Sequence, residues 1–352
     1  MDSKGVISRP RKSSFASFSK LVVYVICGAG ALAAAIVYFV FFHRKPSPTH
    51  SLPMVVTRLE TSFSGLLDVA EARGYFRDEG LAVTILRTQT GYQAISAVTE
   101  GRATVGTSAE APIASALARG QKVKIIASIF TALRAKSGIV ARRDHGVSQP
   151  GDLKGKRIAV LYGSSTHYML ETFLVYNDVP LDSVTLVPLK TDELAPALVS
   201  GEVDAASIWE PMSSAAQAKL GDKAIAFSAQ GVYSEMNNLF VGDGHTPETR
   251  DKVVRYLRAL AKAEDFTQTN AEEASRIIAT ASGVDPVEFR RQWNPLDYGL
   301  ELSQSLLLAT ENEARWFLRR GMVTGGRVPD ILDAFDAEYL RQVKPSAVGV
   351  VK

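Results

Sequence analysis

Hydrophobic residues are distributed along the chain in two distinct ways. One uninterrupted apolar segment, Leu21–Phe42, is 22 residues long and carries no charge. From about residue 54 onward, short apolar runs alternate with segments in which apolar residues recur every three or four positions. Short apolar runs favour buried strands, and the longer spacing favours helices. The chain is therefore predicted to contain an apolar N-terminal helix followed by an α/β body.

The apolar N-terminal segment is long enough to span a bilayer. A 22-residue helix is about 33 Å long, against a hydrocarbon core of about 30 Å. Five basic residues precede the segment and two follow it, which favours a cytoplasmic N-terminus at residues 1–20. A cleaved signal peptide has a shorter apolar region, of about 7–15 residues. We therefore predict a retained transmembrane anchor at residues 21–42 and an extended, proline-rich linker at residues 43–53.

The body alternates predicted strands and helices in its first half and is almost entirely helical after residue 246. Strands are predicted at residues 55–59, 81–86, 104–106, 123–129, 157–160, 184–188, 204–208 and 224–227. Helices are predicted at residues 64–72, 93–99, 111–118, 166–175, 193–199, 211–218, 247–270, 271–281, 286–292, 302–320 and 328–341. Such alternation is typical of mostly parallel sheets with helical crossovers.

Two segments of the body follow the same plan. Glu100–Pro112 and Ser200–Pro211 each run from a helix end through a glycine and a strand to a loop that contains glutamate and proline. This repetition predicts two α/β lobes. Ligands of such sheets bind beyond the carboxyl ends of the strands. The two loops are therefore expected to face a shared cleft.

Charge and cysteine content narrow the range of functions. The chain has 352 residues, with 40 basic and 37 acidic side chains. Residues 1–45 hold seven of the basic and one of the acidic side chains, which leaves 33 and 36 in the body, a formal charge of −3. No nucleic-acid partner is predicted for such a surface. The single cysteine, Cys27, excludes an intrachain disulfide, and five scattered histidines predict no metal site. No cofactor is predicted.

Five motifs occur in an order and spacing typical of one protein family. They are GLLDVAEARGYFRDEGL at 65–81, EGRATVG at 100–106, DLKGKRIAV at 152–160, GSST at 163–166 and GEVDA…WEP at 201–211. Together they make residues 54–345 resemble the solute-binding proteins of the alkanesulfonate/taurine/nitrate group, within the type II periplasmic-binding superfamily.

This resemblance implies a two-lobed fold with a hinge, in which two crossover strands join the lobes. Lobe one would comprise residues 54–139 and 241–352, and lobe two residues 140–240, with crossings near residues 137–142 and 238–242. The family closes around a small-molecule solute and delivers it to the permease and ATPase subunits of an ABC importer. With the anchor, the expected location is the bacterial inner membrane, with the main domain in the periplasm or outside the cell.

The principal candidate ligand site is the loop formed by Ser164, Ser165 and Thr166. It lies between a predicted strand and a predicted helix. Unpaired N–H groups at a helix start carry partial positive charge and, with hydroxyls beside them, can bind a sulfonate, carboxylate or nitrate. The alternative role is a helix N-cap without a ligand. His167 follows in the first helical turn and could contact ligand or be a partly exposed helix residue.

Two further loops contribute candidates. Ser62 and Ser64 offer hydroxyl donors and Phe63 offers apolar surface, although an ordinary strand-to-helix turn explains them equally. Ser108 is a second candidate hydroxyl donor, in the matching loop of the first repeat. A cleft carboxylate would repel an anion, so Glu110 is interpreted as a first-turn residue that the helix dipole favours.

The last candidates lie in the second repeat and near the second crossover. Trp209 offers an apolar wall with one N–H donor, and a core tryptophan is the alternative. Glu210 follows it; if both Glu110 and Glu210 faced inward, a cationic solute would be favoured. Asn237 could reach ligand or satisfy hinge backbone.

These observations predict non-catalytic capture of a small organic anion such as a sulfonate. The chain lacks a Gly-x-Ser-x-Gly elbow and a phosphate-binding loop, and its body lacks a cysteine nucleophile, so no enzymatic activity is predicted. Two alternatives remain open. One is a protein that binds or makes the pyrimidine precursor of thiamine, because such enzymes share the fold. The other is a membrane-anchored sensing ectodomain.

Overall fold

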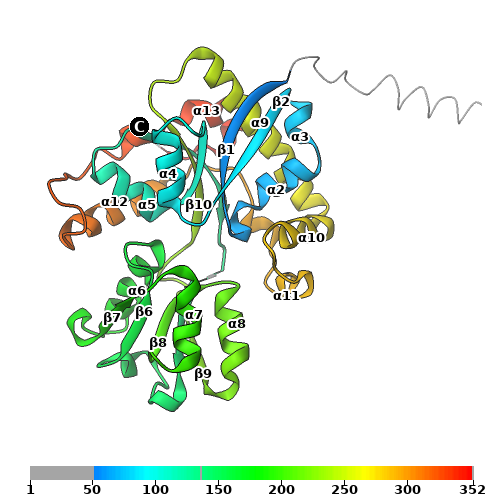
Figure 1. Cartoon of the computed structure of the whole chain (residues 1–352). Coiled ribbons are helices and arrows are strands. Elements are labelled where there is room, and N and C mark those ends of the chain that lie inside the picture. The colour runs from blue at the N-terminus through cyan, green and yellow to red at the C-terminus, as the bar shows by residue number, and fades with distance from the viewer. Residues whose placement is uncertain (1–50, 135–136, 351–352) are drawn as a thin grey trace, which may run out of the picture. The chain divides into compact units, whose positions relative to one another are not determined.

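The computed structural model of the chain describes residues 51–134 and 137–350, which form two five-stranded sheets with helices packed on them (Figure 1). The predicted transmembrane anchor at residues 21–42 lies outside the described residues. Within the described ranges, no helix is both long enough and apolar enough to cross a bilayer.

The first sheet has the strand order β2-β1-β3-β10-β4. Its strands are β1 (Leu52–Leu59), β2 (Leu81–Thr88), β3 (Val105–Ala109), β4 (Val123–Thr131) and β10 (Met236–Gly242). Strand β1 pairs in parallel with β2 and β3, whereas β10 runs antiparallel to β3 and β4. We call this sheet and the helices packed on it lobe one.

Among the described residues, nine helices accompany the first sheet. They are α2 (Gly65–Ala72), α3 (Tyr75–Asp78), α4 (Gly91–Thr99), α5 (Glu110–Ala118), α9 (Pro247–Thr269), α10 (Ala271–Ala281), α11 (Pro286–Arg291), α12 (Gln304–Arg319) and α13 (Ala337–Arg341). Helix α9 packs against α2 and α3, and α12 packs against α5. Their apolar faces and the sheet bury one continuous hydrophobic core.

The second sheet has the order β7-β6-β8-β5-β9 and forms lobe two. Its elements are β5 (Ser137–Arg142), β6 (Arg157–Val160), β7 (Thr185–Pro188), β8 (Ala205–Trp209), β9 (Ala224–Ser228), α6 (Ser165–Tyr176), α7 (Thr191–Ser200) and α8 (Met212–Leu220). Along β5, Ile139 and Ala141 join the core under α6, whereas Val140 joins the core under α7 and α8. Because strand side chains alternate, a sheet covered on both faces needs apolar residues at consecutive positions.

The chain passes between the sheets twice, from β4 to β5 and from β9 to β10. The strand that follows each passage enters its sheet antiparallel to its neighbours: β5 to β8 and β9, and β10 to β3 and β4. Each sheet therefore contains one reversed strand, whereas its other four strands run in the same direction, in agreement with the prediction of mostly parallel sheets. The strands that follow the passages, β5 and β10, are each hydrogen bonded to a neighbouring strand on both sides, which anchors each passage in its sheet.

The prediction of a helix at residues 328–341 was wrong over most of that range. The structure has a helix only at Ala337–Arg341, preceded by irregular chain and a 3-10 turn at Leu332–Ala334. Phe335 forms a bridge with Ile125 of β4, and the N–H of Asp336 donates to the Ile125 carbonyl. A hydrogen bond to the edge strand β4 therefore satisfies the N–H of Asp336, which a helix would otherwise have satisfied internally.

Candidate functional site

A cavity of about 160 Å³ lies between the two lobes. Most of its lining is apolar or aromatic, and includes Leu59, Phe63, Tyr92, Tyr162, Trp209 and Tyr233. Serine and threonine hydroxyl groups come from Thr61, Thr90, Ser137, Ser164, Ser165 and Thr166. Among the described residues, Glu235 is the only ionisable side chain besides the tyrosines in this lining, and no Lys, Arg or His contributes. Apolar walls with a few convergent polar groups are typical of small-molecule sites.

Five of the twelve predicted site residues line this cavity: Phe63, Ser164, Ser165, Thr166 and Trp209. Phe63 lies in the turn between β1 and α2, the hydroxyl residues lie between β6 and α6, and Trp209 ends β8. All of them follow the carboxyl ends of strands. The topology therefore brings them to one place although they are up to about 150 positions apart in the sequence.

The start of α6 combines helix capping with access to the cavity. The Ser164 hydroxyl accepts a hydrogen bond from the His167 N–H at 3.2 Å and donates to the Leu161 carbonyl at 2.6 Å. The Thr166 Oγ1 lies 2.9 Å from the same Ser164 hydroxyl. The N–H groups of Ser165 and Thr166 have no acceptor inside the helix because of their position in its first turn. They are therefore suited to hold an anionic head group.

Ser165 and Gly163 also form hydrogen bonds between the lobes. The Ser165 hydroxyl accepts a hydrogen bond from the N–H of Ala111, in the first turn of α5, at 3.3 Å. The Tyr92 hydroxyl of α4 donates to the Gly163 carbonyl at 2.9 Å. On another side, the Gln292 amide donates to the Ser214 hydroxyl at 2.8 Å. The two lobes are thus in direct contact around the cavity.

A buried glutamate of lobe two, Glu171, forms a charged contact between the lobes. Its carboxylate accepts hydrogen bonds from Trp316 Nε1 at 2.7 Å and from Arg320 Nε at 2.9 Å. Within α6, His167 Nε2 lies 3.1 Å from the same carboxylate. Desolvation raises the pKa of Glu171, but the hydrogen bonds from His167, Arg320 and Trp316 outweigh it and hold the pKa at about 2. The contact is therefore ionised at any ordinary pH.

His167 is buried behind the residues that line the cavity. Its Nδ1 accepts a hydrogen bond from the Gly163 N–H at 3.1 Å, which places the proton of the neutral ring on Nε2, facing Glu171. Its ring packs between Tyr162 and Trp316, with centroid distances of 4.7 and 5.0 Å. Through its hydrogen bond to Gly163, His167 holds the start of the helix that carries Ser164.

Replacing Glu171 with glutamine is expected to favour separation of the lobes, because a neutral amide cannot keep two charge-assisted bonds to Trp316 and Arg320. A hydrogen bond to a charged group contributes about 1.5–3 kcal/mol. Small-angle scattering of ligand-free protein should show a larger radius of gyration for Glu171→Gln. Glu311→Gln is the matched control, since Glu311 forms an exposed pair with Arg315 on the same helix as Trp316. An unchanged radius for both variants would contradict this role of Glu171.

Three other predicted residues lie behind the lining. The Ser64 hydroxyl donates to the Leu59 carbonyl at 3.0 Å and accepts from Asn237 Nδ2 at 3.3 Å. The Ser108 hydroxyl donates to the Ala109 carbonyl at 2.9 Å. Ser64, Ser108 and Asn237 are each fully or almost fully buried. Their contacts hold the strand ends from which the cavity is built, and their predicted role as ligand contacts stays a prediction.

Glu110 opens α5 at the first turn, where the sequence placed it, and is completely buried. The Tyr233 hydroxyl, which belongs to the cavity lining, donates to its carboxylate. Burial is the largest influence and raises the pKa of Glu110 to about 7, with repulsion from Glu235 adding to it and the Tyr233 hydrogen bond opposing it. Glu110 therefore lies behind Tyr233, which forms the cavity surface at this point.

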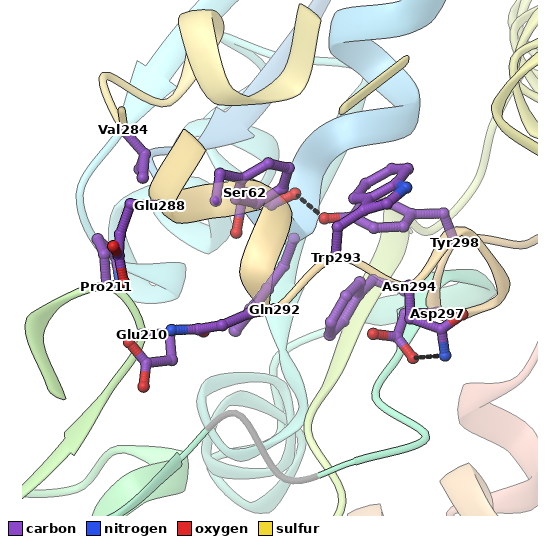
Figure 2. A pocket seen from close by; sticks show the side chains of 13 residues that line it. Ser62, Glu210, Pro211, Val284, Glu288, Gln292, Trp293, Asn294, Asp297 and Tyr298 are labelled. Carbon is purple, nitrogen blue, oxygen red and sulfur yellow. Dashed lines mark hydrogen bonds between the residues drawn. The ribbon is translucent and has the colours of Figure 1, made fainter. Parts of the chain in front are cut away.

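Ser62 and Glu210 line a second, narrower cavity (Figure 2). Its walls are aromatic: Phe63 stacks on Phe130 at 4.4 Å, and Trp293 lies 4.9 Å from Tyr298, measured between ring centroids. The Tyr298 hydroxyl donates to the Ser62 carbonyl at 3.1 Å. Phe63 lines both cavities, whereas Glu110 and Glu210 do not share one. The arrangement that would favour a cationic solute, with both glutamates facing inward together, is not observed.

The sequence analysis missed the tyrosines of the main cavity. Tyr92 and Tyr162 are exposed over 41% and 51% of their surface, unusually high for large aromatic side chains. Tyr92 lies in the first turn of α4 and Tyr162 lies two residues after β6, so both are at strand-to-helix connections like those of the predicted site residues. An aromatic residue at each of these connections was therefore the feature of the sequence that could have identified the tyrosines, whereas the predicted polar contacts were serine and threonine hydroxyls.

Comparisons with known proteins identify the family of this chain. The family model described as "NMT1/THI5 like" matches residues 60–274. The chain belongs to the NMT1/THI5-like family. A Bacillus subtilis protein named for binding aliphatic sulfonates is 27% identical over 268 residues, 75% of this chain and 77% of the relative. The taurine-binding periplasmic protein of Escherichia coli is 28% identical over 144 residues, 41% of this chain and 44% of the relative.

Solved structures show the same fold for this member of the NMT1/THI5-like family. The alkanesulfonate-binding protein SsuA from Xanthomonas axonopodis pv. citri, bound to MOPS, superposes with a TM-score of 0.68 at 19% sequence identity. The superposition covers 82% of this chain and 99% of that protein. The resemblance to sulfonate- and taurine-binding proteins, and the two-sheet periplasmic-binding fold that it implied, are thereby confirmed.

Enzymes also match this chain, over a smaller part of its length. The 4-amino-5-hydroxymethyl-2-methylpyrimidine phosphate synthase of Schizosaccharomyces pombe is 26% identical over 136 residues, 39% of this chain and 38% of the relative. A shared fold does not decide between binding and catalysis. Of the relatives named here, the one matched over the largest share of this chain is the sulfonate-binding protein, at 75%. Among the solved structures, the desulfurization enzyme DszB also superposes on 84% of this chain, with a TM-score of 0.63.

Proposed function

We propose that this protein is an extracytoplasmic solute-binding protein that captures a small organic anion, such as a sulfonate, between its two lobes. The observation that carries this proposal is the first turn of α6, whose free N–H groups and hydroxyls at Ser164, Ser165 and Thr166 meet an apolar cavity that both lobes line. The head group would bind at the helix start. The apolar body of the ligand would pack on Phe63 and Trp209.

The two passages between the sheets support capture by closure. Two connections allow the lobes to move as rigid bodies about a hinge, as in periplasmic binding proteins. The contacts that Tyr92, Ala111 and Gln292 make across the cavity would form as the lobes close. Closure removes water from the cavity, which strengthens the polar contacts to the ligand.

The partners follow from the class of protein. We expect the loaded protein to deliver its ligand to the permease and ATPase subunits of an ABC importer. The apolar segment at residues 21–42 would hold the N-terminus in the bacterial inner membrane, and the described domain would lie in the periplasm or outside the cell. Recovery of the native protein from membranes, with an N-terminal sequence that begins before residue 21, tests this anchoring.

Isothermal titration of the purified full-length protein against a ligand panel tests the function. We expect aliphatic sulfonates to bind with micromolar or tighter affinity, of the order of −8 kcal/mol. The panel should include nitrate, carboxylates of the same chain length, the corresponding primary amines, and aminopyrimidines. Binding of amines alone would contradict anion capture. Binding of aminopyrimidines alone, or their conversion, would favour the alternative related to thiamine.

A further inference from the structure

Two carboxyl groups are buried together directly behind the main cavity. Glu110 begins α5 and Glu313 lies on α12, and these two helices pack side by side in lobe one (Figure 1). Neither side chain has any solvent-exposed surface. Among the described residues, both carboxyl oxygens of Glu313 and the Oε2 of Glu110 have no hydrogen-bond partner.

The groups that face this pair are tyrosines and one more acid. Tyr233 and Glu235 come from the connection between β9 and β10, Tyr92 from α4 and Tyr168 from α6. The charges of two nearby basic side chains affect the tyrosines: Arg119 lowers the pKa of Tyr92, and Arg319 lowers the pKa of Tyr168, although burial raises both pKa values overall. Within the described residues, no ion pair reaches Glu110 or Glu313.

An ionised carboxylate buried without a partner costs several kcal/mol, so such a group retains its proton instead. Burial, followed by repulsion from Glu110, raises the pKa of Glu313 well above its ordinary value. Burial likewise raises the pKa of Glu110. Two interacting carboxyls titrate as one unit. At neutral pH the pair therefore holds at least one proton in the structure described.

Part of the cover over Glu110 comes from outside lobe one. Tyr168 belongs to lobe two, and Tyr233 belongs to the connection between the lobes. The residue after Glu110, Ala111, donates its N–H to Ser165 at the start of α6. Movement of lobe two away from lobe one would remove these groups and admit water to Glu110. The ionised form would then become stable, because a hydrated carboxylate needs no partner.

We propose that Glu110 and Glu313 form a proton-binding site that is filled when the two lobes close on a ligand. This proposal rests on the proposed function and concerns regulation at the same cavity. Capture of an anion would bring one proton with it. Tyr233 links the two events, because it both lines the cavity and donates its hydroxyl to Glu110.

The sign of the pH dependence follows from the direction of the shift. Below the ordinary carboxyl pKa, open and closed forms are both protonated and closure takes up nothing. Between that value and the raised pKa of the closed form, the open form is ionised and the closed form is not, so closure takes up a proton and affinity falls as pH rises. Above the raised pKa both forms are ionised and affinity becomes constant.

Calorimetry of the full-length protein with butanesulfonate tests the proposal, because a sulfonate does not titrate between about pH 5 and pH 8. Titrations in two buffers of different ionisation enthalpy at one pH measure the protons taken up. We expect uptake approaching one proton near pH 6 and an affinity that falls by up to about tenfold per pH unit below pH 7. Uptake of no proton, with pH-independent affinity, would overturn the proposal.

Glu110→Gln supplies the variant, and Glu311→Gln on α12 supplies the control with an exposed carboxylate. Glu110→Gln should abolish proton uptake and flatten the pH profile, whereas Glu311→Gln should retain both. Glu110→Ala serves the same purpose if Glu110→Gln does not fold. Retained proton uptake in both Glu110 variants would overturn the assignment.

Scattering from ligand-free protein separates failure of this proposal from failure of the proposed function. The closed fraction should rise, and the radius of gyration fall, as pH is lowered from about 8 to about 5. Glu110→Gln should remain compact throughout. If sulfonates do not bind but this pattern is present, the proton site stands without the anion assignment. A radius independent of pH in the wild type would contradict the proton site whether or not a sulfonate binds.

Discussion

Replacing Trp209 with alanine is expected to weaken the binding of an aliphatic sulfonate by about 30- to 100-fold, equivalent to about 2–3 kcal/mol for loss of a buried aromatic contact. Trp209 ends β8 at the cavity and offers the broadest side chain of lobe two to the ligand. Its truncation removes apolar contact and leaves space that the closed lobes cannot fill. Isothermal titration measures the effect directly.

Two further variants make the Trp209 result specific. Trp209→Phe keeps most of the apolar surface, so we expect a smaller loss of affinity than for alanine. Tyr176→Ala removes an aromatic side chain at the far end of α6 that is 72% exposed, and should leave affinity unchanged. Equal affinity of wild type and Trp209→Ala would show that the ligand does not use this wall.

The largest expected effect on stability comes from Asp68. Replacing it with alanine should lower the free energy of unfolding by about 3–5 kcal/mol, because the Arg58 guanidinium would remain buried without its counter-ion. Arg58 donates to the Asp68 carboxylate at 2.7 and 2.8 Å, and the exposed fractions of the two side chains are 1% and 4%. Burial raises the pKa of Asp68 despite the hydrogen bonds and charge of Arg58, which shows how costly desolvation is at this position.

Chemical denaturation measures this loss, and a surface ion pair provides the control. Glu273→Ala breaks a pair with Arg73 in which both side chains are more than 40% exposed, and should change stability by about 1 kcal/mol or less. The double variant Arg58→Met with Asp68→Leu should recover much of the loss, because an apolar pair needs no counter-charge. A single Asp68→Ala variant as stable as the wild type would contradict the account of this ion pair.

The Arg58–Asp68 pair also bears on the cavity. It joins the end of β1 to the first turns of α2, and the turn between these elements carries Phe63. Arg58 also donates to the Leu59 carbonyl at 3.1 Å. The position of Phe63 in both cavities therefore depends on a buried contact formed elsewhere in lobe one.

The sequence predicted most elements of the fold because local patterns determine them. The α10 helix begins and ends where its pattern places it, at Ala271–Ala281. The prediction failed where tertiary hydrogen bonding decides: residues 328–336 form no α-helix, and Phe335 and Asp336 bond to the edge strand β4 instead. The antiparallel direction of β5 and β10 also escaped prediction, because it depends on the two long passages between the lobes.

The candidate site was predictable only in part, for a physical reason. Strand-to-helix loops can be found from sequence, and Ser164–Thr166 and Trp209 were found in this way. Whether a loop residue faces the cavity or the wall depends on packing that the sequence does not display, as Ser108 and Asn237 show. The buried pair of Glu110 and Glu313 joins residues about 200 positions apart, and no local pattern could have predicted it.

A crystal structure of the protein with butanesulfonate tests the central claim most directly. The account predicts the sulfonate oxygens within about 3 Å of the N–H groups of Ser165 and Thr166, with the alkyl chain against Phe63 and Trp209. A ligand bound on an outer surface of either lobe, or a sulfonate held away from the start of α6, would contradict it.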